Sequence, residues 1–159
     1  MNRRISRNGI EKLKLFEGFK NHVYTDSGGQ PTIGVGHLLT KAERASGKII
    51  IDGEPIKYRY GLSGEEILLL LSQDVKPIET IVDKLVIIAL TTNQFDALVV
   101  FTFNIGNEAF KSSTLLKMLN KGLYNEVPAQ LKRWVMDNGK VVPGLVNRRN
   151  NEIALWLNK

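Results

Sequence analysis

The sequence predicts an α+β fold with a small β-rich lobe followed by a larger helical lobe, and two observations carry this prediction. Short β-favouring runs separated by Gly- and Asp-rich turns fill most of the chain up to about residue 60. Beyond that point, apolar residues recur with helical spacing between Ser, Thr and Gly residues that can cap helices. The length of 159 residues and the 43% hydrophobic content suit an ordinary globular domain.

The first sixty residues contain one helix and two hairpins in this interpretation. Residues 10–19 place apolar side chains at roughly helical intervals, which predicts a short amphipathic helix. Residues 23–25 and 31–35 are strand-like and flank the turn-forming cluster at 26–29, which predicts a hairpin. The Asp-Gly pair within residues 49–53 predicts a second hairpin with a tight turn.

Helices dominate the remainder of the chain. Ser63 and Glu66 have the spacing of a capping box and open a strongly apolar helix, which Pro77 should kink or end. Capping residues and glycines predict four further helices: 93–105 after Thr92 and before Gly106, one between Ser112 or Ser113 and Gly122, 125–136, and 143 to the end.

Charge and composition narrow the functional classes. The net charge of +6 favours an anionic partner, which could be nucleic acid, a membrane surface or an acidic cell-wall polymer. The absence of cysteine excludes disulfides, thiolate metal sites and cysteine nucleophiles. The most apolar stretch, residues 82–100, is interrupted by charged and polar residues, and the arginine-rich start lacks an apolar segment after it. We therefore expect neither stable membrane insertion nor a cleavable signal peptide.

Two carboxylates near the N-terminus are candidates for acid–base chemistry. Glu17 follows Ile10 and Leu13 along the apolar side of its helix, where burial would raise the pKa of a carboxyl group and keep it protonated. Asp26 falls in a Ser/Gly-rich turn, where exposure and backbone N–H donors would keep it ionised. Such a pair suits glycoside hydrolysis. Taken alone, the two residues would more often be a solvated charge and a turn former.

The residues around this pair form a specific string: Glu17-Gly18-Phe19, then Tyr24-Thr25-Asp26-Ser27-Gly28-Gly29, then Thr32-Ile33-Gly34-Val35-Gly36-His37. The string closely resembles the phage-type lysozymes of glycoside hydrolase family 24, also called endolysins or muramidases. The resemblance continues through segments spread over the chain: 73–74, 93–98, 103–106, 112–116, 144–145 and 148–149. Residues 41–60 are less typical, and no functional residue is assigned there.

The resemblance implies the fold and the catalytic residues. It implies one lysozyme-like domain over residues 1–159, with a β lobe at about 17–62, a connecting helix at about 63–82, a helical lobe of 1–16 with 83–159, and a cleft between the lobes. Glu17 would be the general acid, Asp26 the carboxylate that supports attacking water or developing positive charge, and Thr32 the third residue lining the water site. Inversion at the anomeric carbon is also implied.

Further residues receive roles from the same resemblance. His37 would form a structural ion pair with Asp74 that joins the β lobe to the long helix. Leu38, Phe103 and Asn104 are candidate substrate contacts, although Phe103 could be a core residue and Asn104 equally a helix C-cap. Neither a His-Glu-x-x-His pattern nor a Gly-x-Ser-x-Gly pattern is present, so the chain is expected to use no metal and no cofactor.

Two other patterns have competing interpretations. Gly34 and Gly36 could suggest a phosphate cradle, but no lysine or capped helix follows, so close backbone approach is the better interpretation. Arg148 and Arg149, with Lys132 and Arg133, could form a basic rim facing an acidic polymer or simply a solvated helix face.

The leading functional hypothesis is hydrolysis of the β-1,4 bond between N-acetylmuramic acid and N-acetylglucosamine in bacterial peptidoglycan. By resemblance, the hydrolysis would serve host lysis by a phage or prophage. We expect a monomer that is made in the host cytoplasm, is released by a separate holin and acts on the wall in the periplasm.

Three alternatives remain at the level of sequence. A non-catalytic peptidoglycan-binding module would have kept the fold without turnover, yet all three catalytic positions are present. A nucleic-acid-binding module is favoured by charge alone and lacks a recognisable motif. A transglycosylase that leaves an anhydro sugar would not need the second carboxylate that Asp26 supplies.

Overall fold

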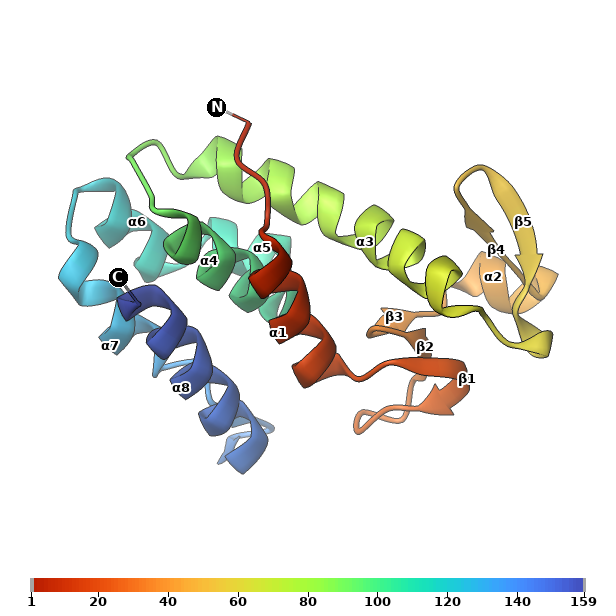
Figure 1. The fold of residues 1–159 in the computed structure, drawn as a ribbon. Helices are drawn as coiled ribbons and strands as arrows, with labels where there is room; N and C mark the ends of the chain where they lie inside the picture. Colours follow the sequence, from red (N-terminus) through yellow and green to blue (C-terminus); the bar gives the residue numbers. More distant parts are fainter. Residues whose placement is uncertain (1, 159) are drawn as a thin grey trace. The chain divides into compact units, whose positions relative to one another are not determined.

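A computed structural model describes residues 2–158 and has the predicted mixture of helices and small sheets (Figure 1). Two compact units make up the chain. Leu13–Lys76 forms one, called here the β-rich unit, and the described residues of Met1–Lys12 and Pro77–Lys159 form the other, called here the helical unit. The α+β fold class is therefore confirmed, and each unit has its own buried core.

Helix α1 (Arg7–Glu17) is tied to the helical unit at its start. The Ser6 hydroxyl accepts a hydrogen bond from Gly9 N at 3.2 Å, as a helix cap does. Ser6 in turn donates from its backbone N to Asp96 Oδ1 at 2.8 Å, and its hydroxyl donates to Asp96 Oδ2. The helix ends where Gly18 adopts a φ of +83°, so Glu17 is its last residue.

A three-stranded antiparallel sheet follows α1 in the order β1 (Lys20–Thr25), β2 (Pro31–Gly34) and β3 (His37–Leu38). Thr32 on the central strand lies between Tyr24 on β1 and Leu38 on β3. The turn between β1 and β2 begins with Asp26, whose backbone N donates to Gln30 O at 2.9 Å. The predicted first hairpin is thus confirmed, and it brings both Asp26 and Thr32 to one end of the sheet.

The segment after the sheet contains a helix that the sequence interpretation missed. Helix α2 (Lys41–Ser46) is only six residues long and buries none of them, so it leaves no apolar periodicity to detect. A capping box between Thr40 and Glu43 stabilises it instead. The predicted second hairpin is confirmed as β4 (Lys48–Ile51) and β5 (Glu54–Lys57), and the 3₁₀ turn η1 (Tyr58–Tyr60) follows it.

Helix α3 (Gly64–Leu85) begins as predicted, because Ser63 and Glu66 exchange hydrogen bonds at 2.8 and 3.1 Å. Pro77 lies inside the helix and does not end it. The last turn of α3 is bound by Arg3, which donates to Asp83 O at 3.0 Å and Val86 O at 2.7 Å. This arginine satisfies carbonyl groups that a helix end otherwise leaves without partners.

The helical unit is built around α4 (Thr92–Ile105), which buries every residue from 95 to 102 and packs along α8 (Pro143–Leu157) (Figure 1). Short elements connect the two: α5 (Asn107–Lys111), α6 (Thr114–Asn120), η2 (Tyr124–Glu126), α7 (Val127–Leu131), β6 (Met136–Asp137) and β7 (Lys140–Val141). Among residues 2–158, none of the helices combines the length and apolar character that crossing a membrane requires.

The predicted boundaries of three helices are wrong. Helix α1 runs over Arg7–Glu17 rather than 10–19. The N-cap of α4 is Thr91 rather than Thr92, because the Thr91 hydroxyl accepts from Gln94 N and Gln94 returns the bond. The helix predicted over 125–136 ends at Leu131, and Met136 starts a small hairpin. Asn138 and Gly139 form the turn of that hairpin with φ values of +51° and +75°, a strong signal that the sequence interpretation overlooked.

Candidate active site

Glu17 lies against the backbone of a glycine. A Cβ atom on Gly36 would come within 2.8 Å of Glu17 Oε2 and 3.0 Å of its Cβ, so only a residue without a side chain fits there. Gly36 also has a φ of +66°, which favours glycine independently. The expectation of close backbone approach is confirmed at Gly36. Glu17 itself is half-buried, and the wall beside its carboxyl group is rigid backbone.

Asp26 is oriented by the turn that it opens. Its Oδ1 atom accepts hydrogen bonds from Gly28 N at 2.9 Å and from Gln30 N at 2.8 Å. This arrangement confirms the expected turn with backbone donors. The second carboxylate oxygen, Oδ2, is turned toward Thr32. One oxygen therefore fixes the position of the side chain, while the other faces the neighbouring strand.

The Thr32 hydroxyl completes a pair of oxygen atoms suited to holding water. Thr32 is 3% exposed, and its Oγ1 donates to Gln30 O at 3.1 Å. The distance from Oγ1 to Asp26 Oδ2 is 3.5 Å, which is long for a direct hydrogen bond. With its proton directed to Gln30, Oγ1 can accept from a water molecule that also donates to Asp26 Oδ2.

Tyr24 lies near both carboxylates, and the sequence interpretation gave it no role. Its hydroxyl donates to the backbone oxygen of Glu17 at 3.3 Å, and on the strand it lies opposite Thr32. Burial raises the pKa of Tyr24, and the negative charges of Glu17 and Asp26 raise it further. One phenol thus lies within electrostatic range of both carboxylates. Its position in the Tyr-x-Asp string was the available signal.

His37 binds a carboxylate at each ring nitrogen. Its Nδ1 is 2.8 Å from Asp74 Oδ2, as expected from the resemblance, and its Nε2 is 2.9 Å from Glu43 Oε1, which was not expected. Burial lowers the pKa of His37, but the hydrogen bonds and charges of Asp74 and Glu43 outweigh burial and raise it to about 9. Both nitrogens therefore carry protons near neutral pH, and the ring joins β3 to α2 and α3.

The expected substrate contacts have different settings. Leu38 on β3 is 51% exposed, so its side chain is available to a ligand. Phe103 and Asn104 lie near the end of α4 in the helical unit, where Phe103 is half-buried and Asn104 exposed. The C-cap of α4 is Gly106, not Asn104, and the Asn104 side-chain oxygen accepts from Arg149 Nη2.

The expectation that Arg148 and Arg149 form a basic rim or a solvated face is wrong. The two side chains are 6% and 1% exposed and both pair with the buried Glu152, Arg149 at 2.6 Å. Arg148 also donates to Val100 O at 3.0 Å, and Arg149 to Trp134 O at 2.9 Å. A sequence cannot separate this buried network from a surface charge run, because the burial comes from packing against α4.

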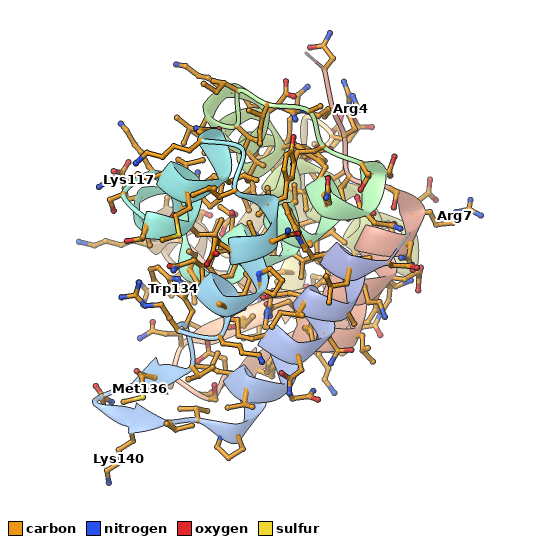
Figure 2. All side chains as sticks on the ribbon, turned by 90° about the vertical axis from the view of Figure 1, so that its left-hand side faces the viewer. Arg4, Arg7, Lys117, Trp134, Met136 and Lys140 are labelled. Carbon is orange, nitrogen blue, oxygen red and sulfur yellow. The ribbon has the colours of Figure 1, made fainter. Side chains whose placement is uncertain are left out.

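Exposed cations lie elsewhere on the helical unit. Figure 2 shows Arg4, Arg7, Lys117 and Lys140 pointing outward from different elements. The positive charge is therefore spread over this unit rather than concentrated in the Arg148–Arg149 pair. Within residues 2–158, no group of three or more His, Asp or Glu side chains is arranged as metal ligands.

Known proteins are similar to this chain in fold and in sequence. Residues 14–152 match the phage lysozyme family. The endolysin of Salmonella phage P22 is 39% identical over 153 residues, which cover 96% of this chain and 97% of that protein. The endolysin of Bacillus phage PZA is 36% identical over 154 residues, and the match spans about half, 54%, of its length. The solved muramidase domain of SpmX from Asticaccaulis excentricus is 34% identical, with a TM-score of 0.79 over 99% of both chains.

The chain therefore belongs to the phage lysozyme family. As the fold and these relatives together establish, it is a lysozyme-type glycosidase that hydrolyses peptidoglycan, acts on the bacterial cell wall and serves lysis of the phage host.

Proposed function

We propose that the protein cleaves the β-1,4 bond between N-acetylmuramic acid and N-acetylglucosamine by acid-assisted attack of water. Glu17, in its protonated form, donates its proton to the glycosidic oxygen as the bond from that oxygen to the anomeric carbon breaks. Asp26 Oδ2 accepts a proton from the attacking water, whose oxygen bonds to the anomeric carbon. Thr32 Oγ1 holds the water in line with that carbon.

The products of this reaction are a new reducing sugar and a free hydroxyl group on the leaving sugar. Water attacks from the side opposite the leaving group, so the anomeric configuration inverts. The cycle closes when Asp26 returns its proton to solvent and Glu17 takes one up.

The single observation that carries the proposal is the unequal use of the two Asp26 oxygens. Oδ1 is occupied by two backbone N–H donors, while Oδ2 lies 3.5 Å from Thr32 Oγ1. This spacing suits a water molecule shared by the two oxygens. The contact of Glu17 with Gly36 supports a fixed position for the acid.

The products of purified peptidoglycan test the proposal. Digestion by the protein should yield new reducing ends, and proton NMR of the first product should show the α anomer before it equilibrates. Anhydro ends would instead identify a transglycosylase. Sedimentation with the wall and no release of fragments would identify a binding module. A first product with the β configuration would overturn inversion and make Asp26 a nucleophile.

Three residues are proposed as substrate contacts because of their family positions: Leu38, Phe103 and Asn104. The exposed Leu38 side chain supports an apolar contact with a sugar ring. For Asn104, substitution by Ala should raise KM more than it lowers kcat if the amide contacts substrate. An unchanged KM would leave its bond to Arg149 as its only role.

Release and assembly are also proposed from the family relationship. A monomer made in the host cytoplasm would reach the periplasmic side of the wall through lesions made by a separate holin. Expression in a bacterial host with and without a holin tests this route, because lysis should require both proteins. Light scattering of the purified protein at micromolar concentration should give the mass of one chain, 17.9 kDa.

A further inference from the structure

The β-rich unit contains a hollow that the catalytic proposal does not use. It has a volume of about 540 Å³, within the usual range for small-ligand sites. Elements β1, β2, α2 and η1 contribute its walls. Its apolar lining consists of Val23, Pro31 and the buried Leu39, whose backbone N donates to Pro31 O at 3.0 Å.

This hollow, called here the arginine pocket, lies behind the strands that carry the catalytic residues. Thr32 faces Asp26, and Tyr24 reaches the end of α1 at Glu17. Neighbouring residues on a strand point to opposite faces of the sheet. The side chain of Pro31, which lines the arginine pocket and precedes Thr32 on β2, therefore belongs to the other face. An occupant would bind beside the reaction site without covering it.

The polar lining of the arginine pocket is cationic. Arg44 from α2 and Arg59 from η1 contribute guanidinium groups, and His22 and Tyr58 contribute an imidazole and a hydroxyl. None of the lining residues is acidic. Within the described part of the chain, neither arginine has a carboxylate within ion-pair distance. Two planar guanidinium groups are thus available, and a guanidinium group can donate two parallel hydrogen bonds to one carboxylate.

Two of the polar side chains are held by their neighbours. The Arg59 guanidinium lies 4.6 Å from the centre of the Tyr60 ring and also donates to the Tyr60 hydroxyl. The Tyr58 hydroxyl donates to Glu43 O at 3.2 Å, which ties η1 to α2. These contacts reduce the conformational freedom that a ligand would otherwise have to restrict.

His22 is fixed by close packing against backbone. A Cβ atom on Gly61 would come within 2.8 Å of the His22 ring, so the imidazole lies directly on this glycine. On either side of that contact, Leu62 N donates to Asn21 O at 2.9 Å, and the Asn21 amide donates to Leu62 O at 2.7 Å. The wall of the arginine pocket that carries His22 is therefore preformed.

We propose that the arginine pocket binds the acidic peptide attached to the glycan of peptidoglycan. This inference rests on peptidoglycan being the substrate. Peptide carboxylates would pair with Arg44 and Arg59, and the methyl groups of alanine residues would contact the apolar floor formed by Val23, Pro31 and Leu39. The arginine pocket would hold a neighbouring peptide of the polymer while the glycan is cut, and so would favour peptide-bearing strands.

A matched pair of double variants tests this proposal. The arginine double variant, Arg44→Gln with Arg59→Gln, removes both guanidinium groups from the arginine pocket. The lysine double variant, Lys41→Gln with Lys48→Gln, removes the same amount of charge from exposed positions outside the pocket. Each double variant is made in a Glu17→Gln background, so binding is measured without turnover. An isolated acidic muramyl peptide is titrated into each protein, and binding is followed by calorimetry and amide NMR. The dissociation constant of the arginine double variant should be at least about tenfold higher than that of the protein with both arginines, and that of the lysine double variant should be unchanged.

The NMR shifts locate the ligand. We expect the largest peptide-induced shifts at His22, Arg44 and Tyr58 in the protein that keeps both arginines. Equal binding by the two double variants would overturn the proposal, as would shifts confined to other residues. Binding of inorganic phosphate but not of the peptide would overturn it in favour of a phosphate-bearing polymer. If the arginine double variant does not fold, the single variant Arg44→Gln, which changes an exposed side chain, replaces it in the binding test.

Kinetics with active protein supply a second readout. The ratio of KM on peptide-bearing peptidoglycan to KM on glycan stripped of peptide should rise several-fold in the arginine double variant and stay constant in the lysine double variant. A constant ratio in both would contradict the proposal. Failure of the catalytic proposal is distinguishable. It would appear as anhydro ends, a first product with the β configuration or no release of fragments by the unsubstituted protein, while peptide binding would stay measurable.

Discussion

The backbone of Gly36 lies directly against the carboxylate of Glu17, so that a Cβ atom on Gly36 would come within 2.8 Å of Glu17 Oε2. The proposed acid is thereby positioned by main chain, which has no rotamers to sample. The glycine is required twice, once for this contact and once for its φ of +66°.

Gly36→Ala should separate these two requirements when it is compared with Gly53→Ala. Both glycines have positive φ, but nothing lies within 4 Å of a Cβ on Gly53. Gly53→Ala should cost about 1–2 kcal/mol of unfolding free energy, and Gly36→Ala should cost more because its Cβ also meets Glu17. Only Gly36→Ala should also lower kcat, by about 100-fold, because it displaces the acid. Denaturant unfolding and wall-clearing assays measure the two effects, and equal activity of the two variants would contradict this role for Gly36.

Asp26→Asn should abolish most activity while it preserves the turn. The amide oxygen of asparagine can accept the same two bonds from Gly28 and Gln30, so unfolding free energy should change by no more than about 1 kcal/mol. An amide cannot take a proton from water, so kcat should fall by about 10²–10⁴-fold. Asp52→Asn, in the exposed turn of the second hairpin, is the control. A loss of only a few-fold would mean that Asp26 does not act as a base.

Thr32→Val and Thr32→Ser distinguish the hydroxyl from the volume of the side chain. Valine keeps the shape but loses the hydroxyl, including its bond to Gln30 O, which should cost about 1 kcal/mol of stability. The activity of Thr32→Val should fall about 100-fold because the attacking water loses a partner, whereas Thr32→Ser should retain most activity. Steady-state kinetics on solubilised glycan measures both, and a fully active valine variant would remove Thr32 from the site.

His37 should make stability depend on pH above neutrality. Its folded pKa of about 9 exceeds the ordinary 6.5, so the protonated ring stabilises the fold fully below about pH 6.5 and progressively less as pH rises through 9. The difference between the folded and the ordinary pKa corresponds to about 3 kcal/mol of unfolding free energy. The stability of wild type relative to His37→Asn should therefore be larger at pH 6 than at pH 9.5. A difference independent of pH would mean that the ring is not charged in the fold.

NMR titration can test whether the two carboxylates bound to His37 cause its raised pKa. Glu43→Gln and Asp74→Asn should each lower the pKa of the His37 ring toward its ordinary value, because each removes one hydrogen-bonded negative charge. A titration that is unchanged in both variants would assign the raised pKa to another cause.

Local signals in the sequence were sufficient for much of the fold. The Ser63–Glu66 capping box and the Asp52-Gly53 turn each depend on a few adjacent residues, and both were predicted. Helix α2 was missed because it buries nothing, and the second carboxylate on His37 was missed with it, since Glu43 belongs to that helix. Arg148 and Arg149 were misjudged because their burial depends on the distant α4.

Some features of the candidate site could likewise be predicted from local sequence, and others could not. Asp26 and its backbone donors are four residues apart at most, so the turn could be foreseen. The catalytic roles of Glu17 and Thr32 came mainly from the resemblance, and they stay predictions. The position of Tyr24 opposite Thr32 depends on the register of β1 against β2, which no local pattern sets.

The central claim is that Glu17 donates the proton to the glycosidic oxygen. Purified peptidoglycan should be incubated with the protein and with Glu17→Gln, and turbidity and reducing ends should be followed together with sedimentation of the protein on the wall. The account predicts that Glu17→Gln folds and binds the wall as the unsubstituted protein does, while release of reducing ends falls by about 10²–10⁴-fold. Undiminished release of reducing ends by Glu17→Gln would contradict the account.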